Sequence, residues 1–247
     1  MSVATRIVSC LIGPAGEARV SDVRIGLGYT AVSLSNGRAG VAYTFLDEAR
    51  GGCSVFAGIR PLVGRPATDL LALLVSGDPI EAAVGLACAN ALANRRDENH
   101  LDGNVLDHIG IGTADNVAMV GNFAPLVEEI EKHSRSLTIF ERIEQPSGFL
   151  RPEKEALEAL PRCDVAIITA TAIINRTIDD LLSAAANARE VVILGASTPL
   201  VPDVFTGKAT VLSGVVVKNP DGVLRVVSER GGMRQFGPHI RKVTVRV

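Results

Sequence analysis

The chain contains no tryptophan, and aromatic residues make up only 4% of its 247 residues. Aromatic side chains are the platforms on which proteins stack unpaired bases, so their scarcity argues against RNA binding. A basic excess is also missing, because 25 Lys and Arg stand against 27 Asp and Glu. Proteins that bind nucleic acids or membrane surfaces carry a surplus of positive charge. We therefore expect neither nucleic acid nor membrane among the partners.

Cysteine is scarce and widely spaced. Cys10, Cys53, Cys88 and Cys163 form no CxxC pair, which excludes zinc-ribbon and thioredoxin motifs and favours reduced, mostly buried thiols. No apolar run approaches the roughly 20 residues of a membrane span, and the first residues lack the pattern of a secretory signal. Because 47% of the residues are hydrophobic and 21% charged, we expect a globular, soluble, cytoplasmic protein.

The first 94 residues predict a small α+β unit. The first 50 residues are expected to be mainly strands, because β-branched and aromatic residues fill 23–34 and 40–45, and Asn36-Gly37 supplies a hairpin turn between them. A short helix is expected over 70–74. A longer one begins at Pro79, with Asp78 as its N-cap, and continues to about Asn94.

The polar stretch 95–104 is the best candidate for a boundary, and it divides the chain into 1–98 and 99–247. Beyond it, wholly apolar segments alternate with helical segments of roughly 10 residues, the pattern of a parallel sheet covered on both faces. The predicted strands are 117–120, 137–140, 165–169, 191–194 and 209–217, and the predicted helices are 125–133, 152–160, 177–188 and 223–228. The fold class is therefore α/β: a Rossmann-like three-layer domain with a parallel sheet, preceded by a small α+β domain.

In open parallel sheets, ligands bind at the carboxyl ends of the strands, where the strand order reverses. The loop after the first predicted strand contains Gly121, Asn122 and Phe123. Its single glycine allows a tight turn but does not make a GxGxxG motif, and the helix N-terminus behind it suits an anion. Glu141 follows the next strand, 20 residues after Gly121, a spacing at which a carboxylate can bind ribose hydroxyls; the alternative is a solvated side chain.

Two further loops supply hydroxyl and amide groups. Asn175 or Thr177 is expected to cap a helix. Thr169 and Thr171 stand directly at a strand end, and at least one of them is expected to face a ligand. After the next strand come Gly195, Ser197, Thr198 and Pro199. The four loops together predict one polar crevice, which would bind a small molecule.

No nucleophile–base motif is present, so no catalytic residue is assigned. His100 and His108 share a segment with several carboxylates, a combination that could bind a transition metal. A solvated linker is the favoured explanation, because no i, i+4 pair of histidines sets a metal geometry. Cys53, between Gly52 and Ser54, is the thiol that we expect to be exposed. These three residues are the only candidates for metal ligands.

Several of these segments resemble one known family, described as "putative heavy-metal chelation". The segments are VAMVGNFAPLVEEI (117–130), CDVAIITATAIINRTIDDLL (163–182), VVILGASTPLVPDVF (191–205), LSG (212–214) and GGMRQF (231–236). The resemblance covers nearly the whole chain. It implies a front domain similar to the N-terminal domain of enolase and a Rossmann-like back domain, with a ligand cleft between them.

The resemblance also implies a set of site residues. Besides the loop residues above, it adds Asn90 on the predicted helix, Pro125, and the pair Gly231-Gly232, where Met233 departs from the family's glycine run. Soft metals prefer thiolate and imidazole, whereas most of these groups are hydroxyls, amides and backbone. The expected ligand is therefore a transition metal or a metal chelate, with the metal carried by an organic molecule or held by Cys53 or His100.

Two other functions remain open at this point. One is a nucleotide- or S-adenosylmethionine-dependent enzyme that uses the Rossmann-like crevice, with Glu141 on a ribose. The other is a scaffold whose loops serve packing and the contacts of a homodimer.

Overall fold

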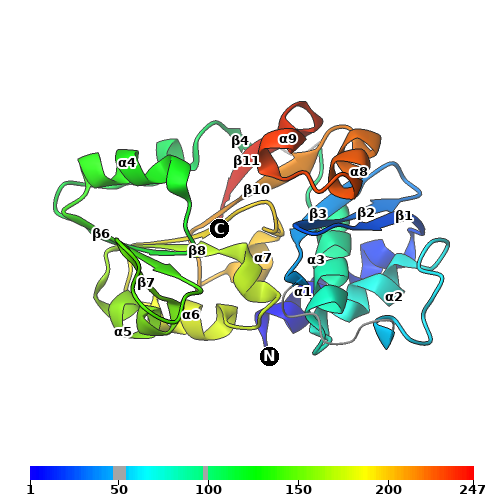
Figure 1. Ribbon diagram of the computed structural model, residues 1–247, viewed down its shortest axis with the longest axis horizontal. Helices are drawn as coiled ribbons and strands as arrows, with labels where there is room; N and C mark the ends of the chain where they lie inside the picture. Colours follow the sequence, from blue (N-terminus) through cyan, green and yellow to red (C-terminus); the bar gives the residue numbers. More distant parts are fainter. Residues whose placement is uncertain (47–53, 97–99) are drawn as a thin grey trace.

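The chain is organised around two β-sheets, one of three strands and one of eight (Figure 1). The computed structural model describes residues 1–46, 54–96 and 100–247. The three-stranded sheet comes from the first part of the sequence, and the eight-stranded sheet from the remainder. In the described part of the chain, no helix is both long and apolar enough to cross a bilayer.

The small sheet is antiparallel, in the order β1 (Val20–Ile25), β2 (Tyr29–Leu34), β3 (Ala39–Tyr43). The single strand expected over 23–34 is wrong, because Gly26 and Gly28 turn the chain and split the segment into β1 and β2. The hairpin at Asn36-Gly37 is confirmed: Gly37 has φ +77°, the conformation that favours glycine.

Three helices lie on one side of this sheet. Helix α3 (Pro79–Ala93) packs on β2 and β3, and α1 (Val3–Gly16) and α2 (Ala67–Ala72), which continues as η3 (Leu73–Val75), pack on α3. The expectation of strands over the first 50 residues misses α1. The sequence does contain a helical pattern here, because the apolar residues Val3, Ile7 and Leu11 recur every four residues. The structure buries all three on one face of the helix. The oxygen of Ser2 caps this helix at the N–H of Thr5.

Helix α3 is buried along almost its whole length, as its alanine-rich sequence suggests. Asp78 caps it as predicted, accepting from the N–H groups of Ile80 and Glu81 at 2.8 and 3.2 Å. The helix lies against β3 with little space between them. A Cβ on Gly40 would stand 2.2 Å from the nitrogen of Ala91, so only glycine fits there.

The eight-stranded sheet has the order β4-β11-β10-β9-β8-β5-β6-β7. Its parallel strands are β5 (Asn116–Val120), β6 (Ser136–Glu141), β7 (Leu150–Pro152), β8 (Val165–Thr169), β9 (Glu190–Leu194) and β10 (Val211–Val217). Counted along the chain from β5, this is the 3-2-1-4-5-6 order of Rossmann folds, which confirms the predicted fold class. The order reverses between β5 and β8, so the switch point lies there.

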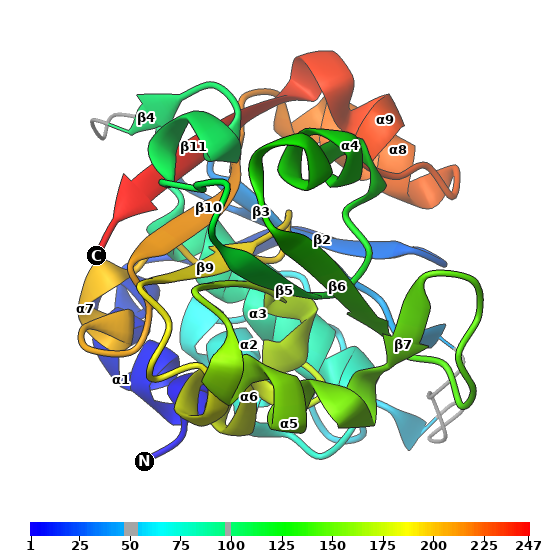
Figure 2. The same cartoon turned by 90° about the vertical axis from the view of Figure 1, so that its left-hand side faces the viewer.

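Helices cover both faces of the sheet, as Figure 2 shows. On one face lie η4 (Val105–His108) and α4 (Ala124–His133), packed on Val117, Met119 and Ile139. The residues between them in sequence, such as Ala118 and Val120, face the other side, where α5 (Ala156–Ala159) and α6 (Ile178–Ala184) lie. Two short 3-10 turns flank α5, namely η5 (Glu153–Glu155) and η6 (Leu160–Arg162). A third, η7 (Ala170–Ile173), follows β8. The helix expected over 177–188 ends at Ala184.

The last third of the chain joins the two sheets. Helix α7 (Pro202–Phe205) contacts α1, and α8 (Pro220–Ser228) lies against β1 and β2 on the side away from α3. After α9 (Met233–Phe236) and η8 (Gly237–His239), the chain forms β11 (Ile240–Arg246), a strand that was not predicted from the sequence. This strand pairs antiparallel with β10 and with the short β4 (Leu101–Asp102). The division at residue 98 stays a prediction.

Candidate functional site

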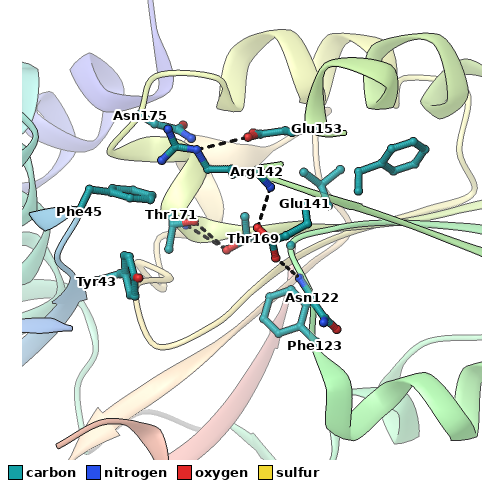
Figure 3. Close-up of a pocket in the computed structure, with 13 residues that line it drawn as sticks. Tyr43, Phe45, Asn122, Phe123, Glu141, Arg142, Glu153, Thr169, Thr171 and Asn175 are labelled. Atoms are coloured by element: carbon teal, nitrogen blue, oxygen red, sulfur yellow. Dashed lines mark hydrogen bonds and ion pairs between the residues drawn. The ribbon is translucent and has the colours of Figure 1, made fainter. Parts of the chain in front are cut away.

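A pocket of about 250 Å³ opens at the switch point between β5 and β8. Its lining residues come from the carboxyl ends of β5, β6 and β8, from the segments that follow them, and from the end of β3 (Figure 3). Seven of the residues that we expected at a ligand site are among those that line this pocket: Gly121, Asn122, Phe123, Glu141, Thr169, Thr171 and Asn175. The topology thus brings three of the four predicted loops to one place.

Gly121 sets the shape of the first loop. Its φ is +90°, and a Cβ at this position would lie 2.9 Å from the Cβ of Thr169. The side chain of Thr169 therefore occupies the space that any larger residue at 121 would need. The turn after β5 and the end of β8 are in contact only because residue 121 has no side chain.

Thr169 and Thr171 present a pair of hydroxyl groups to the pocket. The two oxygens are 2.9 Å apart, and the Oγ1 of Thr169 also accepts from the N–H of Thr171, capping η7. Asn175 accepts from both the N–H and the hydroxyl of Thr177, at 3.2 and 2.8 Å. Capping thus accounts for some of the polar groups of this loop. Thr169, Thr171 and Asn175 nevertheless line the pocket as well.

Glu141 is held by the backbone on both of its oxygens. One accepts from the N–H of Asn122 at 3.0 Å, and the other accepts from the N–H of Arg142 at 2.8 Å. These bonds tie Glu141, at the end of β6, to the loop that follows β5, as the dashed lines in Figure 3 show. A carboxylate oxygen can accept more than one hydrogen bond, so Glu141 can still meet a hydroxyl donor of a ligand.

The opposite wall of the pocket was missed by sequence reasoning and consists of Tyr43, Phe45, Arg142 and Glu153. The guanidinium of Arg142 lies 4.7 Å from the centre of the Phe45 ring and 3.6 Å from a carboxylate oxygen of Glu153. Tyr43 packs edge-on against Phe45, with ring centres 5.0 Å apart. Arg142 is therefore held between an aromatic face and a carboxylate, with its charge at the pocket wall.

The aromatic packing extends behind this wall. Tyr29 contacts Tyr43 and Phe236 edge-on, at 5.8 and 5.1 Å between ring centres. Burial, with a smaller effect from Tyr43, raises the pKa of Tyr29 to about 12, so this hydroxyl stays protonated at neutral pH. Gly232, the N-cap of α9, lies beside the Tyr29 ring. Gly231 and Gly232 are thus near the aromatic cluster, but they are not among the residues that line the pocket.

The fourth predicted loop has a different position from that expected. Ser197 and Thr198 are buried, and the Oγ of Ser197 accepts from the N–H of Tyr43 at 2.9 Å. Gly195 lies behind the Phe123 ring. Asn90 is buried on α3 and donates to the carbonyl of Val41 at 2.8 Å. These residues support the pocket from behind, and none of them lines it.

The histidines proposed as metal ligands are not part of this site. The ring of His108 is hydrogen-bonded to the carbonyl of Asp102 at 2.8 Å, on η4. Neither His100 nor His108 lines the pocket. Among the described residues, no group of three or more His, Cys, Asp or Glu is arranged to hold a metal ion. Cys53 lies outside the described residues.

Two of the remaining thiols are also poorly suited to metals. Cys88 and Cys163 are buried and reduced. Burial raises the pKa of Cys88 to about 12 and is the main cause that raises the pKa of Cys163 to about 11. Metals bind the thiolate, so both side chains are unreactive at neutral pH. Cys10, on α1, is exposed.

These features define a two-part α/β protein with a Rossmann strand order and a pocket between its switch point and a small antiparallel sheet. The chain belongs to the family described as "Putative heavy-metal chelation": two models with this description match residues 8–93 and 104–246. An uncharacterized protein of Methanocaldococcus jannaschii is 28% identical over 202 residues, which cover 77% of this chain and 75% of that protein.

Two crystal structures of proteins of unknown function from this family have the same fold. The protein from Pyrococcus horikoshii has a TM-score of 0.86 at 23% identity, covering 99% of this chain and 100% of its own. The protein from Desulfitobacterium hafniense has a TM-score of 0.82 at 23% identity, covering 98% and 99%. The similarity to an enolase N-terminal domain stays a prediction.

Proposed function

We propose that this protein binds a small organic molecule that carries a metal ion, in the pocket between β3 and the ends of β5, β6 and β8. The observation that supports this most strongly is the character of the lining. It offers an arginine, hydroxyl groups, two amides, aromatic faces and two carboxylates that already have partners, with no thiol or imidazole among the described lining residues. Such groups recognise an organic anion rather than a bare soft metal ion.

Direct coordination of a metal does not fit the two carboxylates of the pocket. Both oxygens of Glu141 accept backbone N–H groups, and Glu153 is paired with Arg142. A soft metal ion there would meet only hard oxygen ligands, because no thiol or imidazole is found among the described lining residues. The metal is therefore cargo that enters with its own organic ligand.

The shape of the pocket agrees with such a ligand. Phe45 and Tyr43 form an apolar wall on one side, while the hydroxyls of Thr169 and Thr171 face the opening from the other (Figure 3). Arg142 provides a planar set of donors that matches a carboxylate. We infer a chelate with free carboxylates, for which metal citrate is a simple probe.

Calorimetric titration of the protein with nickel citrate, nickel chloride and free citrate tests this proposal. We expect the complex to bind more tightly than either component alone. Arg142→Ala should weaken binding about tenfold or more, since a charge-assisted contact is lost. Arg135→Ala is the matched control, because it removes an exposed arginine beside the opposite end of β6. Equal binding of nickel chloride and nickel citrate would contradict the proposal.

One observation favours a nucleoside as an alternative ligand. Glu141 ends the second strand of a Rossmann order and lines the pocket, which is the place where a carboxylate meets ribose hydroxyls. Under this alternative, adenosine or S-adenosylmethionine raises the melting temperature, and Glu141→Gln removes the effect without unfolding the chain. A nucleoside effect that survives Glu141→Gln would exclude this role for the residue.

A further inference from the structure

A second cavity of about 250 Å³ lies away from the pocket at the switch point, and the two share no lining residue. It is formed where the β2–β3 hairpin meets the end of α3 and the last residue of β10. Its described lining residues are Asn36, Gly37, Arg38, Ala39, Asn94, Arg96 and Val217. We propose that this cavity is a binding site for a phosphate group.

The charge of the cavity is the first argument. Arg38 and Arg96 enter it from different elements, and no carboxylate is found among its described lining residues. Neither arginine makes an ion pair with any residue of the described chain, although eight other basic residues do. Two guanidinium groups at one cavity, with no carboxylate among its described lining residues, attract a doubly charged anion.

The second argument is that both arginines are attached to ordered parts of the fold. The Nε of Arg96 donates to the carbonyl of Val217 at 2.8 Å, which fixes the guanidinium plane at the cavity. Arg38 stands in the hairpin turn, where its backbone N–H donates to the side-chain oxygen of Asn36 at 3.1 Å, which fixes the backbone from which its side chain extends. Because its side chain is already restrained, Arg96 loses less entropy when it binds an anion.

A third lining residue, Asn94, is held rigidly by the fold. Asn94 is buried, and its amide donates to the carbonyls of Thr198 and Val215, both at 3.0 Å, while its oxygen accepts from the N–H of Leu200 at 2.8 Å. Its side chain is thus fully engaged in the fold. The groups left to meet a ligand are the terminal nitrogens of Arg38 and Arg96 and the amide of Asn36.

A structural role explains only one of the two charges. A cation after the C-terminus of α3 complements the helix dipole, and Arg96 is in that position. Arg38 comes from the hairpin and has no such reason to be there. The volume of about 250 Å³ leaves room for a phosphate ion or a small phosphate monoester.

The test is a calorimetric titration with inorganic phosphate and with glycerol phosphate, in a buffer free of other polyvalent anions and at constant ionic strength set with chloride. Phosphate should bind, and Arg38→Gln combined with Arg96→Gln should weaken binding at least tenfold. Tighter binding of phosphate than of the monoester identifies the free ion as the ligand. The opposite order identifies an ester. Either result supports the site.

Controls separate this site from the pocket at the switch point. Arg135→Gln removes one exposed positive charge elsewhere and should leave phosphate binding unchanged, as should Arg142→Ala. Circular dichroism and thermal melting without phosphate establish that the double variant is folded. No binding of either phosphate compound overturns the proposal, and so does binding that is lost in Arg142→Ala but kept in the double variant. Neither outcome affects the proposed binding of a metal chelate.

Discussion

The backbone N–H of Tyr43 donates a hydrogen bond of 2.9 Å to the side-chain oxygen of Ser197. This bond joins the end of β3, which carries the aromatic wall of the pocket, to the loop that follows β9. Three residues further along that loop, the N–H of Leu200 donates to Asn94 on α3. The two sides of the pocket are therefore held at a fixed distance by side chains that do not line it.

Ser197→Ala should destabilise the protein and also weaken ligand binding. The substitution removes the acceptor of a partly buried backbone N–H, a loss of about 1–2 kcal/mol in the free energy of unfolding. Urea denaturation measures this change. Ser183→Ala is the control, because that exposed hydroxyl bonds only within its own helix, and its substitution should cost less than about 0.5 kcal/mol. Equal stability of the two variants would show that the Tyr43 bond contributes nothing.

Asn94→Ala should have a larger effect on stability. Three hydrogen bonds are lost at a buried position, and the partner groups at Thr198, Leu200 and Val215 are left without them. Unsatisfied buried groups cost roughly 1–3 kcal/mol each, so we expect a loss of at least about 3 kcal/mol. The same denaturation experiment on Asn187→Ala, an exposed asparagine, provides the baseline. A loss below 1 kcal/mol in Asn94→Ala would contradict this role.

Gly121→Ala tests the contact that shapes the pocket. A positive φ costs a non-glycine residue about 1–3 kcal/mol, and the new methyl group would in addition meet Thr169. Gly207→Ala separates the two effects, because Gly207 has φ +72° and open space around it. Gly121→Ala should therefore be the less stable variant in urea. It should also bind metal citrate more weakly, whereas Gly207→Ala should bind normally.

Sequence patterns predicted the core of the large sheet because its strands are buried on both faces. Segments such as 117–120 and 165–169 are continuous apolar runs, and they are recognisable without any knowledge of their neighbours. The ends of such strands necessarily meet at one edge. For this reason, Gly121, Glu141 and Thr169 could be placed at one site from the sequence alone.

Other elements could not be recognised by the same reasoning. β11 (Ile240–Arg246) mixes β-branched residues with Arg241, Lys242 and Arg246, so it lacks the continuous apolar run by which the buried strands were recognised. The aromatic wall depends on long-range contacts: Tyr43 lies about 100 residues from Glu141 in sequence, and no local pattern links them. Ser197 looked like a ligand contact because a hydroxyl after a strand can equally bind a ligand or a neighbouring backbone group.

The pair of Asp115 and Arg189 should make stability depend on pH. The side chain of Arg189 donates to both oxygens of Asp115, at 3.1 and 2.7 Å, and the N–H of Gly112 donates at 2.7 Å. The bond to Arg189 first, and that to Gly112 second, lower the pKa of Asp115 below its usual 3.8. A lowered pKa contributes stability above the unfolded value, and this contribution disappears as the pH falls through the folded value.

Asp115→Asn should therefore be less stable than the original chain by roughly 1.5–3 kcal/mol at pH 6, the range for hydrogen bonds to charged groups. The difference should shrink as the pH falls below about 4. Urea denaturation at a series of pH values from 6 to 3 measures it. Asp22→Asn, which disrupts an exposed pair with Arg24, should change stability little at any pH. A difference for Asp115→Asn that stays constant down to pH 3 would show that its charge is not responsible.

The thiols offer a test of whether the fold itself can supply ligands to soft metals. With pKa values raised to about 12 and about 11, Cys88 and Cys163 carry almost no thiolate at pH 8, whereas Cys10 is exposed. Iodoacetamide should therefore modify Cys10 at least tenfold faster than either buried thiol, measured by peptide mass mapping over time. In 8 M urea the rates should converge, because every thiol then has an ordinary pKa and full access. Rapid modification of Cys88 or Cys163 in the folded chain would mean that these thiols are accessible. Direct coordination of a metal ion by a thiolate would then be possible, which would weaken the proposal that the metal enters as a chelate.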